Sequence, residues 1–508
     1  MDRTQRFSIF YRLAPSLVLN FLINDSPMLE FLNHLWEEVS EPFFSGISLL
    51  IGFTYAHVLT WLGFILGIMI IGRMLNEKRT PSNIFAWAFA VLLFPWLGVP
   101  LYFLLGGRKS RGLVERKRKV MRDSRYLAGE DVPPEELKQL RQTEGNSCEL
   151  LPDATSTFEA ILEGIENSRS CIHIMTYILS KDEAGIPVVE ALTRKAKEGV
   201  KVRLLLDAFG FLGNGGKWID ELKEAGGEVA RFMPLLPLHS HSSANLRNHR
   251  KLAIFDHRRA ITGGQNIDMR FMGPTSSEET FRDFSIDVQG PVLRHLNFLF
   301  LNDWIFASGQ KADGFSEIFS MDFPEMGDRS LEIIESGPEV STDALYERIL
   351  ELVQDCRETL TIVTPYFVPD EVLFRSLMVK SHTGRKVRLI VPRHSNQKLV
   401  DVARFHYLRQ LHDAGVDIQF YMPGMIHAKL ILIDGKIALS GSANFDMRSL
   451  FVNFEMGIVH THPADFEAFS DWVGKIEKDC QPMEDVEMPQ GKSRKVVEDF
   501  AHLVGPLL

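Results

Sequence analysis

The chain has 508 residues, of which 45% are hydrophobic and 24% are charged, and it carries a formal net charge of −10 at pH 7. This length leaves room for two or three domains with large cores. The negative balance argues against a nucleic-acid-binding protein, which has to neutralise phosphates.

Residues 1–46 begin with several arginines and continue into the apolar stretch LAPSLVLNFLI. This stretch is similar to the core of a weak signal peptide, but no small-residue cleavage site follows it. The pattern therefore favours an interfacial or loosely packed helix over a segment that is cleaved.

Residues 47–107 predict a transmembrane helical hairpin. The run 47–71 contains no acidic residue, lysine or arginine, and it is long enough to cross a bilayer as a helix. A second uncharged run, 83–105, contains Pro95 and Pro100, which predict a kink. A re-entrant helix over this proline-containing run is the alternative arrangement.

Residues 108–146 predict a basic linker. It opens on a cluster of cations: Arg108, Lys109, Arg111, Arg116, Lys117, Arg118 and Lys119. Positive charge beside a membrane segment places everything downstream in the cytoplasm. The same cations should attract anionic lipid headgroups.

From residue 147 the chain repeats itself, with one half over 147–325 and the other over 326–482. The stretch TFEAILEGIENSRSCIHIMTYILSKDEAG is echoed by LYERILELVQDCRETLTIVTPYFVPDEVL, and each predicts a helix followed by a strand that ends in Tyr177 or Tyr366. Helices that alternate with β-rich runs predict an α/β fold of two similar αβα lobes, related by a pseudo-twofold axis. Residues 483–508 follow as a C-terminal tail or helix.

Each half carries the pattern H-x-K-x4-D-x6-G-[GS]-x-N, first as HRKLAIFDHRRAITGGQN from His249 and then as HAKLILIDGKIALSGSAN from His427. A histidine and a lysine two positions apart on a strand point to the same face. The four apolar residues that follow predict a buried strand, and the turn residues behind them predict a return strand. Each copy is therefore expected to fold as a β-hairpin.

Folding each copy about its aspartate brings a histidine, a lysine and an asparagine together. Lysine faces glycine across each hairpin and histidine lies near asparagine: Lys251 opposite Gly263, Lys429 opposite Gly441, His249 near Asn266 and His427 near Asn444. The glycines would remove bulk where a ligand approaches the backbone. Asp256 and Asp434 belong to the turns, where we expect them to hold the hairpins rather than take part in the chemistry.

A strand after each motif carries an acid, Asp283 in RDFSIDVQGP and Glu455 in NFEMGIVHT. We expect each carboxylate to accept a hydrogen bond from Nδ1 of the histidine in its own half, which would fix the tautomer and the ring orientation. An ordinary salt bridge is the alternative for both acids.

A zinc site over His239, His241 and His249 lacks an accompanying cysteine or carboxylate at a suitable spacing, so no metal is expected. The loop PLLPLHSHSS, which holds the first two of these histidines, is apolar for a loop. It either lines an entrance for acyl chains or forms a buried connector.

The double motif resembles the HKD signature of the phospholipase D superfamily. The stretches NLRNHRK, TPYFVPDE and NFDMRSLFVNFE, together with RTPSNIFAWAFAVLLFPWLGVPLYFLLG near the N-terminus, are similar to bacterial cardiolipin synthases. The resemblance extends from the region of Ile47 to about residue 480. It implies that both motifs meet in one cleft between the lobes.

The residue types suit the transfer of a phosphoryl group in such a cleft. Lys251 and Lys429 would neutralise the charge of a phosphodiester, and Asn266 and Asn444 would bind the substrate as neutral donors. A neutral imidazole attacks phosphorus to give a covalent phosphohistidine, while a protonated one donates to the leaving alkoxide. The lysines supply the positive charge, so no metal or other cofactor is needed.

The resemblance assigns His249 as the nucleophile and His427 as the general acid and base. The near-symmetry of the two motifs leaves the reverse assignment open. The full catalytic pattern comprises His249, Lys251, Asp256, His427, Lys429 and Asp434.

The resemblance also implies the reaction. One phosphatidylglycerol donates its phosphatidyl group, glycerol leaves, and the hydroxyl of a second phosphatidylglycerol attacks to give cardiolipin. Phosphatidylglycerol, other anionic phospholipids and the bilayer would be the partners of a multi-pass protein in the bacterial inner membrane, with its lobes in the cytoplasm. The cysteines form no closely spaced pair and fit that reducing compartment: Cys148, Cys171, Cys356 and Cys480.

Three other functions compete with this one. A hydrolytic phospholipase D, which releases phosphatidic acid, shares every catalytic residue. A scaffold protein is disfavoured by the intact histidine and lysine of both motifs, and a nuclease by the acidic balance and the membrane segment. The pattern makes no prediction about an oligomeric state.

Overall fold

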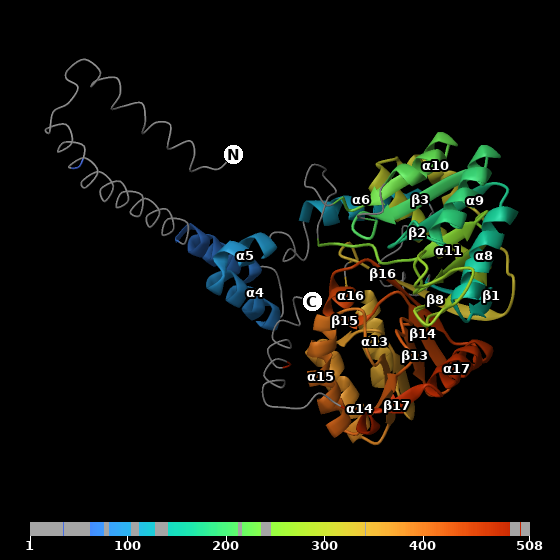
Figure 1. The fold of residues 1–508 in the computed structure, drawn as a ribbon. Helices are drawn as coiled ribbons and strands as arrows, with labels where there is room; N and C mark the ends of the chain where they lie inside the picture. Colours follow the sequence, from blue (N-terminus) through green and yellow to red (C-terminus); the bar gives the residue numbers. More distant parts are fainter. Residues whose placement is uncertain are drawn as a thin grey trace, which may run out of the picture. The chain divides into compact units, whose positions relative to one another are not determined.

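The computed structural model describes residues 34, 61–75, 81–102, 111–127, 141–211, 216–234, 245–340, 342–487 and 498 (Figure 1). These residues belong to two compact units, one drawn from 1–77 and 90–99 and the other from 78–89 and 100–508. The predicted N-terminal segment 1–46 lies outside the described residues apart from His34, and so do His239 and His241.

The second helix of the predicted membrane hairpin is interrupted. Residues 61–75 are helical, and the earlier part of the expected first helix lies outside the described residues. In place of one helix over 83–105 the chain has α4 (Pro81–Leu93) and α5 (Pro95–Leu101). The break falls at Phe94, because a residue that precedes proline is biased away from the helical conformation. Among the described residues, no helix combines the length and the apolar character that crossing a bilayer requires.

The predicted basic linker contains a helix that packs into the fold. α6 (Arg111–Leu127) lies against α11 (Leu293–Ser308). Its buried side chains recur at helical spacing: Leu113, Val114, Lys117, Met121 and Ser124. The range 108–146, predicted as a basic linker, therefore contains α6 and, from residue 142, the start of the first strand. The charge run concealed this buried stripe.

Both halves contribute to one 15-stranded sheet. The first half supplies β1 (Gln142–Leu151), β2 (Cys171–Thr176), β3 (Lys201–Asp207), β4 (Glu228–Phe232), β5 (Leu252–Phe255), β6 (Arg259–Gly263) and β7 (Ser285–Gln289). The second half supplies β8 (Arg329–Ser336), β9 (Thr359–Val363), β11 (Lys386–Pro392), β12 (Asp417–Tyr421), β13 (Leu430–Ile433), β14 (Ile437–Gly441), β16 (Glu455–His460) and β17 (Cys480–Pro482).

The strand order repeats outwards from the antiparallel pair β1 and β8. On one side β7, β6, β5, β2, β3 and β4 follow β1, and on the other side β16, β14, β13, β9, β11 and β12 follow β8 in the matching order. The two lobes therefore share a topology, as the internal repeat predicts. They also share one continuous sheet, which the repeat alone did not predict. Figure 1 shows the first lobe in green and the second in orange and red.

Helices cover both faces of this sheet. One face packs against α8 (Ala154–Asn167), α9 (Gly185–Lys197) and α10 (Asp220–Glu224) in the first lobe, and against α13 (Ala344–Asp355), α14 (Glu371–His382) and α15 (Lys398–Asp413) in the second. The other face packs against α6, α11 and α17 (Pro463–Glu477). Shorter elements complete the fold: η2 (Gly216–Ile219), η3 (Ala312–Phe315), α12 (Ser316–Phe319), β10 (Phe367–Val368), β15 (Phe445–Asp446), α16 (Met447–Phe451) and η4 (Met483–Asp485).

Side chains of the motif strands alternate between these two faces. In β5, Leu252 and Ile254 belong to the core beneath α11, whereas Ala253 and Phe255 belong to the core beneath α8 and α9. A strand that is buried on both faces needs apolar residues at every position. This explains the four-residue apolar run in each motif, and it anchors each hairpin in the middle of its lobe.

Candidate active site

The two motif hairpins have the register that the sequence predicts. β5 and β6 pair so that Lys251 lies opposite Gly263, and β13 and β14 pair so that Lys429 lies opposite Gly441. The glycines serve a different purpose from the one expected. A Cβ at Gly441 would lie 2.3 Å from the backbone oxygen of Met456, so glycine allows the next strand to pack closely. It does not make room for a ligand.

Asp256 and Asp434 occupy the hairpin turns, with φ angles of 50° and 52°. Their carboxylates accept backbone N–H groups at the start of a neighbouring strand, from Arg169, Ser170 and Cys171 for Asp256 and from Arg357, Glu358 and Thr359 for Asp434. Burial opposes their ionisation, but these hydrogen bonds outweigh it and lower the pKa of both carboxyls. Neither residue lines the cavity that holds the histidines. These contacts show that Asp256 and Asp434 tie each hairpin turn to the start of a neighbouring strand.

Both motifs meet at one cavity of about 220 Å³. His249 and Asn266 line it from the first half, and His427 and Asn444 line it from the second. The cleft that the family resemblance implies is therefore present between the lobes.

The two lysines lie next to the histidines. The Lys251 ammonium donates to the His249 carbonyl at 2.6 Å, and Lys429 Nζ lies 3.0 Å from Nε2 of His427. Both lysines are buried, and burial lowers the pKa of Lys251 to about 7 and that of Lys429 to about 8. An anion in the cavity would favour the protonated form of each lysine. Neither lysine lines the cavity itself, and the pair is suited to stabilise a negatively charged phosphodiester there through its charge.

Each histidine is held by the acid of the other half. Nδ1 of His427 lies 2.8 Å from Oδ2 of Asp283, and Nδ1 of His249 lies 3.2 Å from Oε2 of Glu455. The expectation that each acid binds the histidine of its own half is wrong. Neither half can orient its histidine without the other.

Short β-bridges between the halves cause this exchange. Asn248 bridges to Phe454, and Ile426 bridges to Arg282. These four residues directly precede the two histidines and the two acids in the chain. Because each motif pairs with the segment that leads into the acid of the other half, its histidine faces that acid.

The contacts of His249 fix its tautomer. Nδ1 lies 3.1 Å from the Ser442 carbonyl as well as beside the Glu455 carboxylate, and both groups can only accept. Nδ1 therefore carries the proton of the neutral ring, and Nε2 keeps its lone pair. Burial lowers the pKa of His249 and holds that of His427 well below its usual value, so the neutral form of both rings is favoured.

The two orienting acids differ in their charge state. Burial raises the pKa of Asp283 to about 6. Burial acts in the same direction on Glu455, but His249 and Lys251 outweigh it and keep its pKa below the usual value. The Ser442 hydroxyl also donates to Glu455, at 2.5 Å. At neutral pH Glu455 is the more completely ionised of the two.

Residues that were not predicted as site residues also line the cavity, among them Tyr177, Tyr366 and Arg448. Tyr177 packs edge-on against His249, with ring centroids 5.0 Å apart. Tyr366 donates to Oδ1 of Asn396 at 2.5 Å, and Arg448 approaches from the second half. The sequence held signals for them, because a tyrosine follows the equivalent strand of each half and the pattern N-x-D-M-R ends each motif.

The repeated pattern N-x-D-M-R places Arg270 and Arg448 in different surroundings. Arg270 pairs with Asp268 at 2.8 Å and has a side chain that is 48% exposed. Arg448 donates to Oδ1 of Asn245 at 3.1 Å and lines the cavity. Of these two arginines, Arg448 is the one placed to contact a ligand there.

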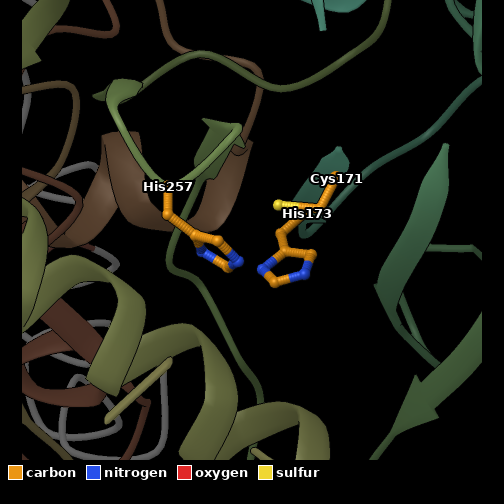
Figure 2. Close-up of side chains that lie close together, drawn as sticks. All are labelled: Cys171, His173 and His257. Carbon is orange, nitrogen blue, oxygen red and sulfur yellow. The ribbon is translucent and has the colours of Figure 1, made fainter. Parts of the chain in front are cut away.

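A group of potential metal ligands lies away from this cavity. Figure 2 shows the side chains of Cys171, His173 and His257 gathered together, and their ligand atoms lie within 4.8 Å of one another. The Arg203 guanidinium donates to Nε2 of His173 at 3.1 Å, which leaves the proton of the neutral ring on Nδ1. That N–H and the adjacent cation both disfavour a metal ion, so we assign none to this group.

A second cavity, of about 1090 Å³, lies beside α6. Seven basic side chains line it: Arg116, Arg118, Lys119, Arg122, Arg125, Arg141 and Lys311. Four acidic side chains line it as well: Asp123, Asp313, Glu335 and Glu339. The excess of positive charge favours anionic groups at this surface.

Comparison with known proteins agrees with this geometry. A family described as "Cardiolipin synthase, PLD-like domain" matches residues 161–297 and 349–477, and one described as "Phospholipase_D-nuclease N-terminal" matches residues 61–107. The fold is similar to that in the crystal structure of the phosphatidylserine synthase of Haemophilus influenzae Rd KW20. That similarity has a TM-score of 0.56 at 16% identity, and it covers 71% of this chain and 95% of that one.

Curated relatives extend the match along nearly the whole chain. Cardiolipin synthase 1 of Bacillus anthracis is 30% identical, over 91% of this chain and 97% of the relative. The cardiolipin synthase of Geobacillus sp. (strain WCH70) is 30% identical, over 97% of this chain and 99% of the relative. That of Clostridium perfringens (strain 13 / Type A) is 31% identical, over 85% and 95%. The chain therefore belongs to the cardiolipin synthase family of phospholipase D-like proteins.

Proposed function

We propose that the protein is a phosphatidyltransferase that makes cardiolipin from two molecules of phosphatidylglycerol and releases glycerol. The observation that carries this proposal is the single cavity at which two histidines and two asparagines meet, with a buried lysine beside each histidine. The cardiolipin synthases named above match it over nearly their whole length, which supports the choice of substrate.

In the first step a phosphatidylglycerol phosphate lies in the cavity, where Lys251 and Lys429 neutralise its charge. Nε2 of His249 attacks phosphorus, and the bond from phosphorus to the headgroup oxygen breaks. His427 gives its proton to that oxygen, and glycerol leaves. The phosphatidyl group is then bound covalently to His249.

In the second step the headgroup of another phosphatidylglycerol occupies the place of glycerol. Its hydroxyl gives its proton to His427 and attacks phosphorus. The bond between phosphorus and His249 breaks, cardiolipin leaves, and both imidazoles return to their starting states. Water in place of the second lipid would give phosphatidic acid.

The contacts of the two histidines support this division of roles. His249 keeps its lone pair on Nε2 and donates from Nδ1 to an ionised carboxylate, which makes the ring a stronger nucleophile. His427 contacts Asp283, and the arriving phosphate adds a second negative charge. Both charges favour the protonated form that a general acid needs.

The two asparagines would act differently on the substrate. Oδ1 of Asn266 accepts the Ile178 N–H at 3.2 Å, which orients the amide so that its NH₂ group can donate to a phosphate oxygen. Oδ1 of Asn444 is buried and accepts no hydrogen bond within the described part of the chain. We assign it to the hydroxyl of the incoming headgroup.

The proposal places the enzyme at the bacterial inner membrane. Residues 47–107 would form a membrane-embedded hairpin, and the lobes, which we set at 147–325 and 326–482, would lie in the cytoplasm. Support comes from large apolar side chains that the described residues leave exposed, such as Trp61 at 66% and Phe85 at 74%. The match of the N-terminal family to residues 61–107 also supports it.

The basic cavity beside α6 supports contact between this helix and anionic headgroups. Protease treatment of membrane vesicles tests the orientation. Cleavage within the lobes is expected only in inside-out vesicles, and cleavage in sealed right-side-out vesicles would contradict it.

The experiment that tests the proposed reaction compares bacterial membranes that carry the wild type with membranes that carry His249→Ala. Mass spectrometry of the lipids should show a rise in cardiolipin with the wild type alone. Equal lipid profiles would remove the synthase assignment, and a rise in phosphatidic acid in place of cardiolipin would show hydrolysis.

A further inference from the structure

We propose that Lys117 is a positioning residue for phosphatidyl transfer, because its ammonium holds Asp303 and Asp303 holds both neighbours of His249. Lys117 lies on α6, in the stretch whose sequence predicts a solvated basic linker. The proposal rests on the transfer reaction proposed above and concerns how the nucleophile is kept in place.

Asp303 on α11 is the centre of this arrangement. Its Oδ1 accepts from the Lys117 ammonium. Its Oδ2 accepts from the Asn248 amide at 2.8 Å and from the Arg250 guanidinium at 2.9 Å. Asn248 and Arg250 stand immediately before and after His249 in the chain. One carboxylate therefore holds the side chains of the residues on both sides of the nucleophile.

Arg250 extends the arrangement to the orienting acid. Its Nε donates to the backbone oxygen of Glu455 at 3.0 Å, and another nitrogen of the guanidinium donates to the Ser336 carbonyl at 2.8 Å. Glu455 is the residue whose carboxylate accepts from Nδ1 of His249. The position of Arg250 thus affects both His249, which donates this hydrogen bond, and Glu455, which accepts it.

The charged side chains around Asp303 are all buried, so the number of positive charges has to match the number of negative charges. Lys117 is 1% exposed, and its Nζ lies 5.7 to 5.8 Å from the ring centroids of Phe232, Phe306 and Phe454. Two cations, Lys117 and Arg250, face two carboxylates, Asp303 and Glu339. Loss of one cation leaves an uncompensated buried charge.

Among the described residues, Arg250 would be the cation left beside both carboxylates without Lys117. It already lies 3.8 Å from Glu339, and Lys117 lies 4.0 Å from the same carboxylate. Asp303 and Glu339 would then compete for Arg250, and the guanidinium would leave its present position beside the Glu455 backbone. A displacement of about 1 Å at a reacting group costs roughly 100-fold in rate.

The second half lacks this arrangement. Ala428 stands where the first motif has Arg250, and Ile426 stands where it has Asn248. The effect of Lys117 should therefore fall on the step in which His249 attacks. It should not fall on substrate affinity, because neither Lys117 nor Asp303 lines the catalytic cavity.

The test uses the full chain in lipid vesicles, with phosphatidylglycerol that is labelled in the headgroup. The first-order rate constant of glycerol release in a single turnover is measured, because it does not depend on the fraction of folded enzyme. The variants are Lys117→Met, Lys117→Arg and the double variant Lys117→Met with Glu339→Gln, which restores the charge balance. Lys195→Met is the matched control, since Lys195 is a buried lysine of the first lobe that pairs with Glu198 at 3.0 Å.

Lys117→Met should lower this rate constant by roughly 10- to 100-fold with an unchanged KM. Lys117→Arg and the double variant should recover most of the loss, and Lys195→Met should match the wild type. A normal rate constant in Lys117→Met, or a loss that Lys195→Met shares, would overturn the proposal. If Lys117→Met does not fold, the double variant is measured in its place. A rate constant of the double variant 10-fold or more below that of the wild type would then overturn the proposal. A wild type that releases no glycerol would instead refute the transfer reaction.

Discussion

Nδ1 of His249, in the first half of the chain, lies 3.2 Å from the carboxylate of Glu455, in the second half. The reciprocal pair, His427 and Asp283, lies 2.8 Å apart. Each half therefore provides a histidine that it does not orient and an acid that it does not use itself. This exchange makes the catalytic unit a property of both halves together.

Covalent trapping identifies the nucleophile. A phosphatidyl ester of p-nitrophenol has a leaving group that needs no proton, so the first step can proceed without the general acid. His427→Ala should release one equivalent of p-nitrophenol and accumulate a phosphatidyl group on His249, as found by mass spectrometry of peptides. His249→Ala should form no adduct. An adduct on His427 in the His249→Ala variant would reverse the assignment.

The same ester tests the exchanged acids. Glu455→Gln should slow the burst of p-nitrophenol by about 100-fold, because His249 loses the ionised carboxylate that makes its ring a stronger nucleophile. Asp283→Asn should leave the burst nearly unchanged but slow the reaction with phosphatidylglycerol, whose leaving group needs the proton from His427. If Asp283→Asn slows the burst and Glu455→Gln does not, while His249 is the trapped nucleophile, each acid serves the histidine of its own half.

The pKa values of the two lysines predict an alkaline loss of activity. Burial lowers these values to about 7 for Lys251 and about 8 for Lys429, so both cations are lost as the pH rises through this range. The value of kcat/KM should fall there, since it reports the free enzyme. The bound phosphate raises both pKa values, so kcat should fall at higher pH. A kcat/KM that stays constant through pH 8 would contradict the account.

Asp256 should matter for stability rather than for chemistry. Its carboxylate accepts three backbone N–H groups, so Asp256→Ala should lower the free energy of unfolding by about 1–3 kcal/mol. The single-turnover rate constant should stay near that of the wild type. Because the folded pKa is lowered, the stabilisation is present above the unfolded pKa and is lost as the pH falls through the folded value. A stable variant with a slow first step would assign Asp256 a chemical role.

The hairpins could be predicted from the sequence because their causes are local. The spacing from His249 to Asn266 sets the strand, the turn and the return strand, and the register follows from these. The exchange of Asp283 and Glu455 could not be predicted in this way. It depends on bridges between segments more than a hundred residues apart, and no spacing within one half reports them.

The role of α6 was concealed for a different reason. A run of cations usually marks a solvated face, and Lys117 is one cation among several in that run. Lys117 can be buried because Asp303, on a helix far along the chain, neutralises its charge. The sequence around Lys117 does not reveal this partner. The apolar positions Leu113, Val114 and Met121 were a weaker signal of a packed helix at the same place.

We propose that one cavity passes a phosphatidyl group from one lipid to another. This proposal is tested most directly by incubating the purified full chain with phosphatidylglycerol as the only lipid and measuring cardiolipin, glycerol and phosphatidic acid together. Equal amounts of cardiolipin and glycerol are expected, and both should be absent with His249→Ala. Glycerol accompanied by an equal amount of phosphatidic acid, or no glycerol at all, would contradict the proposal.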